Sequence, residues 1–120
     1  MAICSQIVSY VADTAASAAL YARILDQQPM TSGPGFATFA LPGGTVLALR
    51  DRDAVQPRAT LPGGTELGFP VASADKVRLT RDAWARLGLR IIQEPVQLEF
   101  GYTFTAADPD GHRLRVFSPA

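Results

Sequence analysis

The chain has 120 residues, of which 48% are hydrophobic and 18% charged, and its 11 basic side chains balance its 11 acidic ones. This length predicts a single domain, and the charge balance argues against nucleic acid or an anionic membrane as a partner, because both require a basic surface. The one cysteine, Cys4, can form no intramolecular disulfide, the N-terminal residues lack a signal-peptide pattern, and no apolar run reaches the length of a membrane span. We therefore expect a cytoplasmic protein.

The first half of the chain shows the order strand, helix, strand, strand. Residues 3–11 alternate loosely between apolar and polar side chains and include β-branched residues, which indicates a strand. Asp13 is a suitable N-cap for the alanine-rich stretch 15–25, which predicts a helix. Two further strands are expected over 36–41 and 45–50, joined by a Pro-Gly-Gly turn.

The second half repeats this order about 60 residues later, after a polar, proline-bearing stretch over 54–64 that has the composition of a linker. The expected elements are a strand over 65–71, a helix from Ser73 or Asp75 to Leu87 that ends before Gly88, and strands over 89–93, 100–107 and 112–117. The repeated order indicates an internal duplication of half the chain length.

The duplicated order carries a resemblance to a known family. Together with the turn Asp-Pro-Asp-Gly-His at 108–112 and the strand after it, it resembles the vicinal oxygen chelate superfamily, which includes glyoxalase I, extradiol dioxygenases and bleomycin resistance proteins. The stretch 93–116 is similar to phenazine antibiotic resistance proteins, non-metal members that hold a planar drug. The resemblance implies an α+β glyoxalase/bleomycin-resistance domain over 1–120, built of two βαβββ modules at about 1–53 and 65–120. It also implies curved mixed sheets with the helices on their convex faces.

The resemblance also implies where a metal would bind. Metal-using relatives take one ligand from each of four strands, and the corresponding positions here are Gln6, Ala48, Glu66 and Arg115. Alanine has no donor atom, and arginine is a fixed cation with no lone pair to give. We therefore expect no bound metal and no other cofactor.

The first candidates for ligand binding are polar side chains on the expected strands 65–71, 100–107 and 112–117. Arg115 alternates with apolar neighbours, and either it is a solvated strand arginine or it holds a ligand and pairs with Glu66. Thr103 and Thr105 are on the parity that faces the cavity in relatives, although the opposite parity stays open. Gln6 completes this polar set.

The first half offers two aromatic candidates and one cation. Tyr10 and Phe39 are candidate pocket walls, and the ordinary alternative for a strand aromatic is the core. Arg50 could stack on a ring or clamp a carboxylate, and the ordinary alternative is a solvated strand end. No nucleophile stands beside a general base in the sequence, so no catalytic residue is predicted.

Three functions are compatible with these residues. The leading hypothesis is non-catalytic binding and sequestration of a planar aromatic antibiotic or metabolite, as in phenazine or bleomycin resistance. The alternatives are a metal-dependent lyase, isomerase or dioxygenase of the same fold, and an interaction module that has lost its ligand. Because relatives complete each pocket from a second chain, the leading hypothesis includes a homodimer.

Overall fold

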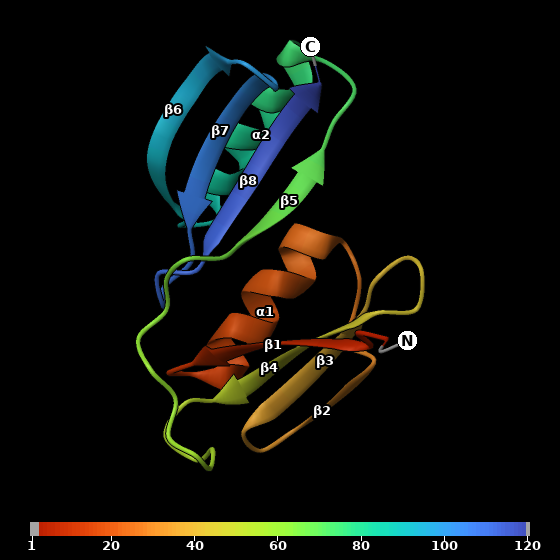
Figure 1. The fold of residues 1–120 in the computed structure, drawn as a ribbon, viewed down its shortest axis with the longest axis vertical. Coiled ribbons are helices and arrows are strands. Elements are labelled where there is room, and N and C mark those ends of the chain that lie inside the picture. Colours follow the sequence, from red (N-terminus) through yellow and green to blue (C-terminus); the bar gives the residue numbers. More distant parts are fainter. Residues whose placement is uncertain (1–2, 120) are drawn as a thin grey trace. The chain divides into compact units, whose positions relative to one another are not determined.

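The computed structural model describes residues 3–119 and divides the chain into two compact units, Met1–Leu61 and Pro62–Ala120. Each unit has one helix and one four-stranded mixed sheet in the order βαβββ (Figure 1). This confirms the α+β fold of two modules, and the division after Leu61 falls inside the stretch expected to be a linker. No helix of the described residues is long and apolar enough to cross a membrane.

The first unit is a sheet with the strand order β1-β4-β3-β2, in which only β1 and β4 are parallel. Its elements are β1 (Gln6–Val11), α1 (Thr14–Leu25), β2 (Thr31–Gly33), β3 (Phe36–Ala40) and β4 (Val46–Asp51). The sequence pattern missed β2. This strand has three residues without a hydrophobic side chain, and it exists because it pairs with β3 in a hairpin through Pro34 and Gly35.

Local chemistry sets the ends of α1. The Asp13 side chain accepts a hydrogen bond from the Ala16 amide at 3.0 Å, as expected of an N-cap. The helix ends at Asp26, which adopts the left-handed conformation with φ at 52° and donates its amide to the Ala22 carbonyl. Tyr21 of α1 is fully buried, so the helix packs on the sheet through this ring.

The second unit has the same topology, with the strand order β5-β8-β7-β6 and one parallel pair, β5 with β8. Its elements are β5 (Glu66–Pro70), α2 (Ala74–Arg86), β6 (Arg90–Leu98), β7 (Gly101–Ala107) and β8 (Arg113–Pro119). Ser73 is the N-cap of α2, since its hydroxyl accepts from the Lys76 amide at 3.2 Å. Gly88 follows the helix with φ at +93°, a conformation that favours glycine.

Strand β6 extends five residues beyond its expected end, through Pro95. Proline has no amide hydrogen and is tolerated on an edge strand or at a bulge. Strand β6 is the last strand of its sheet, and its pairing with β7 shifts register between Gln93 and Val96. This irregularity accommodates Pro95 within the strand.

The core of the second unit is aromatic. The Trp84 ring of α2 packs edge-on against Phe69 of β5 at 5.4 Å and against Phe104 of β7 at 5.6 Å between ring centroids. Such T-shaped pairs add to the free energy gained from burial alone. These contacts fix α2 on the face of the sheet that carries Phe69 and Phe104, and leave the opposite face without a helix of its own unit.

Candidate functional site

The helix-free face of the second sheet, called here its open face, carries the polar residues singled out in the sequence. In β8 the side chains of Leu114 and Val116 are fully buried on the helix face, so Arg115 between them belongs to the open face. Thr105 is paired directly with Arg115, and Thr103 with Phe117. Directly paired residues share a face, so both threonines lie on the open face and the opposite parity is excluded.

Arg115 is the centre of this open face, and its guanidinium has three side-chain partners. Its Nε donates to Glu66 Oε2 at 2.7 Å, and its Nη1 donates to Gln93 Oε1 at 3.1 Å and to Thr103 Oγ1 at 3.2 Å. The hydroxyl of Thr105 donates to the same Gln93 oxygen at 3.1 Å. We call these five residues the Arg115 cluster.

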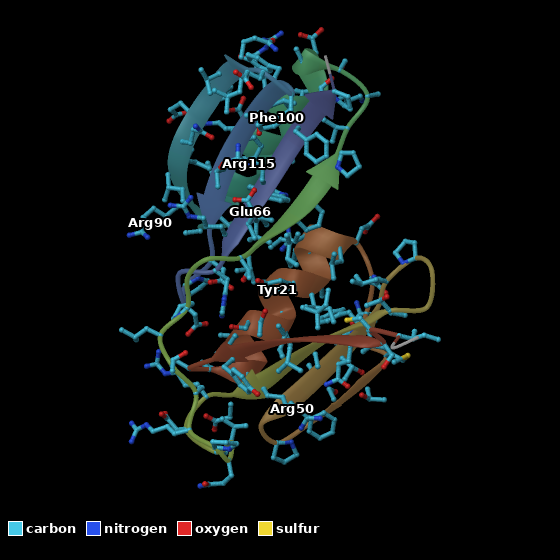
Figure 2. All side chains as sticks on the ribbon, viewed as in Figure 1. Tyr21, Arg50, Glu66, Arg90, Phe100 and Arg115 are labelled. Carbon is cyan, nitrogen blue, oxygen red and sulfur yellow. The ribbon has the colours of Figure 1, made fainter. Side chains whose placement is uncertain are left out.

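The cluster is partly shielded from water. The Arg115 side chain is 18% exposed and that of Glu66 is 35% exposed, and both threonines are buried. The Thr103 hydroxyl also donates to the Val116 carbonyl at 2.8 Å, which fixes its direction. Residues of four strands therefore hold one guanidinium in a defined position (Figure 2).

Two aromatic rings adjoin the cluster. The Phe100 ring lies 5.5 Å from the Arg115 guanidinium and contacts Phe117 edge-on at 6.3 Å between centroids. Phe100 is 49% exposed, which is high for a phenylalanine. The open face thus presents an apolar ring surface beside a positioned cation.

Gln93 and Phe100 were not predicted as site residues. The sequence signal for them was weak, because the irregular pairing around Pro95 obscures which face a β6 residue occupies, and Phe100 precedes β7 by one residue. Their contacts with Arg115 are non-local and become visible only when the strands pair.

The first sheet has an open face of its own. Pairing across three strands places Tyr10, Arg50 and Phe36 in one row, and Gln6 pairs with Val46 on the same face. Arg50 is exposed and lies on the side of the sheet away from α1 (Figure 2). An arginine thus stands between two aromatic residues, of which Phe36 was not foreseen.

Phe39 does not belong to either open face. It pairs with Leu47 and is 0% exposed, and Ala37, Leu49 and Val11, also 0% exposed, share its face. The prediction that Phe39 lines a pocket is wrong, because strand alternation places Thr38 on the open face and Phe39 in the core beneath α1.

The positions where the resemblance places metal ligands do not fit a metal. Ala48, with 1% exposure, contributes a methyl group, and Arg115 brings a positive charge. The carboxylate of Glu66 is already bonded to that guanidinium. This donor set repels a cation instead of binding it.

A second ion pair joins helix to sheet elsewhere in this unit. Arg81 of α2 donates to Glu94 of β6 through two nitrogens, at 2.9 Å each. This bidentate bond lowers the pKa of Glu94 and raises that of Arg81. The pair stabilises the edge strand β6 on α2.

Known proteins resemble this chain over nearly its whole length. It is 28% identical over 110 residues to the phenazine antibiotic resistance protein EhpR of Enterobacter agglomerans, covering 89% of this chain and 84% of that protein. The solution structure of protein ATC0852 from Agrobacterium tumefaciens matches with a TM-score of 0.91 and 41% identity, covering 100% of this chain and 99% of that one. A glyoxalase-related enzyme from Fulvimarina pelagi shares the fold, with a TM-score of 0.88 at 22% identity over 98% of this chain and 88% of that one.

The family follows from these likenesses and from the two βαβββ units. The model of the Glyoxalase/Bleomycin resistance protein/Dioxygenase superfamily matches residues 4–116, and the chain belongs to this superfamily.

Proposed function

We propose that this protein binds a planar aromatic small molecule of the phenazine type on the open face of its second sheet and sequesters it unchanged. The Arg115 guanidinium beside the Phe100 ring is the observation that carries the proposal. A planar ring system stacks favourably on an aromatic face and on a guanidinium plane. Because its three partners already restrict Arg115, binding costs little further side-chain entropy.

The relative that resists a phenazine antibiotic supports the choice of ligand. Its name states resistance to such a compound, and 28% identity over 89% of this chain makes it a distant relative. A binding or resistance role fits both this relative and the superfamily. What we propose for this chain is that its own ligand belongs to the phenazine class.

The hydrogen bonds within the Arg115 cluster support binding of the ligand without a catalysed reaction. Glu66 is its one carboxylate, and it is bonded to Arg115. One oxygen of this carboxylate, Oε2, is held by the guanidinium, and the other four cluster residues include no second acid or base that could exchange a proton with a substrate. None of the five cluster residues forms a pair of nucleophile and base.

A homodimer in the cytoplasm completes the proposal. Each sheet has an open face that its own helix does not cover, and that of the first sheet carries the Tyr10, Arg50 and Phe36 row. A second copy of the chain would supply the missing wall of each pocket. Light scattering at micromolar protein tests this, and a mass near 12.8 kDa would contradict it.

The test of binding is a fluorescence or calorimetric titration with phenazine, followed by mass analysis of the recovered compound. Phe100→Ala is expected to weaken binding about tenfold, since it removes a ring contact of about 1 kcal/mol and exposed apolar area. Leu79→Ala is the control, because Leu79 is a 60% exposed apolar residue on α2. Equal affinity of the Phe100 variant and the unsubstituted protein, or recovery of a chemically altered compound, would refute the proposal.

A further inference from the structure

A hollow of about 610 Å³ opens at one end of the second sheet, beside the Arg115 cluster. Its wall includes Arg90 at the start of β6, Arg113 at the start of β8, Ala107 between them and Glu66 of β5. Figure 2 shows Arg90 and Glu66 at this end of the sheet. We call this cavity the Arg90–Arg113 hollow.

Strand pairing places the two arginines on either side of a small residue. Ala107 of β7 pairs with Arg90 on one side and with Arg113 on the other. The two arginine backbones are therefore two strand spacings apart, roughly 10 Å. The methyl group of Ala107 leaves the space above β7 open, so both long side chains border the same cavity.

Neither guanidinium is bonded to a carboxylate of the described residues. Within residues 3–119, no ion pair or side-chain hydrogen bond involves the guanidinium of Arg90 or of Arg113, although Arg115 nearby has three partners. Glu66 is directly opposite Arg113 on β5, but its carboxylate is bonded to Arg115, so the N–H donors of Arg90 and Arg113 are the ones that a bound anion would meet on this concave wall.

Two acidic residues around the hollow, Glu66 and Asp108, are already engaged in hydrogen bonds. Glu66 is bonded to Arg115 at 2.7 Å. Asp108 and Asp110 border Arg90 in an adjoining depression, and Asp108 accepts the backbone amides of Asp110 at 3.0 Å and of His112 at 2.9 Å. The Asp-Pro-Asp-Gly turn therefore uses Asp108 to hold its own backbone.

We propose that the Arg90–Arg113 hollow binds a carboxylate of the ligand, so that the ligand is a planar aromatic acid. The inference rests on the proposed function, because it places the ring system on the neighbouring Arg115 cluster, which the hollow adjoins through Glu66. An arginine matches a carboxylate with two parallel N–H donors, and two arginines supply more donors than one acid group needs.

The test compares phenazine-1-carboxylate with phenazine-1-carboxamide, which has nearly the same shape without the charge. The unsubstituted protein is expected to bind the acid about tenfold more tightly at low salt, and added salt should reduce this preference. Arg113→Gln and Arg90→Gln should each bring the ratio of the two affinities toward one. Arg86→Gln is the control, since Arg86 is exposed in the last turn of α2 and outside the hollow, and it should keep the ratio.

The outcomes separate this inference from the proposed function. Equal binding of acid and amide overturns the inference and leaves phenazine binding standing. If neither compound binds, the proposed function is wrong, and the hollow is judged by NMR titration with benzoate, benzamide and inorganic phosphate. Shifts of the Arg90 and Arg113 amides with benzoate but not benzamide support a carboxylate site, whereas no shift, or a shift with phosphate alone, overturns it.

Discussion

The ion pair between Glu66 and Arg115 is expected to be energetically coupled, and a double-mutant cycle measures this. The variants are Arg115→Met, which keeps an unbranched apolar side chain, Glu66→Gln, which keeps the size and one acceptor, and the double variant. The cycle removes the effects that each substitution has by itself. What remains is the interaction of the two side chains with each other.

The structure sets the expected magnitude between two limits. Exposed ion pairs contribute about 0.2–1 kcal/mol, and removing one partner of a fully buried pair costs about 3–5 kcal/mol. Here the side chains are 18% and 35% exposed and the N–O distance is 2.7 Å, so the pair is partly desolvated. We expect a coupling free energy of about 1–1.5 kcal/mol, and about 2–3 kcal/mol of destabilisation for Arg115→Met, because Gln93 and Thr103 also lose a donor.

The assay is urea unfolding followed by circular dichroism, from which the free energy of unfolding of all four proteins is obtained. The control cycle uses Asp75 and Arg78 on α2, an i,i+3 pair whose side chains are 84% and 52% exposed. Its coupling should be no more than about 0.5 kcal/mol. A Glu66–Arg115 coupling as small as that of the control would show that water screens the cluster, and the argument for a pre-positioned guanidinium would fail.

The remaining predictions concern the fold that supports this site. Phe104→Ala should lower the free energy of unfolding by about 3–5 kcal/mol and weaken the near-UV signal of Trp84, whose ring it contacts; a loss below 1 kcal/mol would contradict the packing. The pKa of Glu94 is lowered by Arg81, so this pair stabilises the fold above the unfolded-state pKa of Glu94 and loses that effect as pH falls through the lower folded value. Acid titration of stability should therefore be shallower in Arg81→Gln, and an unchanged profile would refute this. Asp13→Ala should cost about 1 kcal/mol through the lost cap of α1, whereas Asp13→Asn should retain most of the stability.

The fold could be predicted where short-range chemistry decides it. Asp13 and Ser73 cap their helices through residues three positions away, and Gly88 takes a positive φ after α2, so both helices were located from the sequence. The extent of the strands depends on partners elsewhere in the chain. Strand β2 forms only because β3 pairs with it, and β6 continues past Pro95 only because an edge strand tolerates an irregular register.

The candidate site was predictable to the extent that alternation in β8 is regular. Leu114 and Val116 fix the parity of Arg115. Its bond to Glu66 was one of two alternatives that the sequence left open, and in the sheet Glu66 is directly opposite Arg113 and not Arg115. Phe39 failed as a pocket residue, because a strand aromatic packs on either face and one sequence does not distinguish them. Gln93 needed the pairing of β6 with β7 before its contact with Arg115 could be known.

Arg115 places a guanidinium on the open face of the second sheet, where metal-using members of the superfamily would have a metal ligand. A metal ion in such a place would act as a Lewis acid, which requires anionic or neutral donors around it. Here the cation is part of the chain, its charge is compensated by Glu66, and its Nη1 donates to Gln93 and Thr103. A guanidinium in this state orients a ligand through stacking and hydrogen bonds but activates no water molecule. In the proposed function, the arginine that opposes metal binding thus holds the ligand, and the recognition of ligand charge falls to Arg90 and Arg113 nearby.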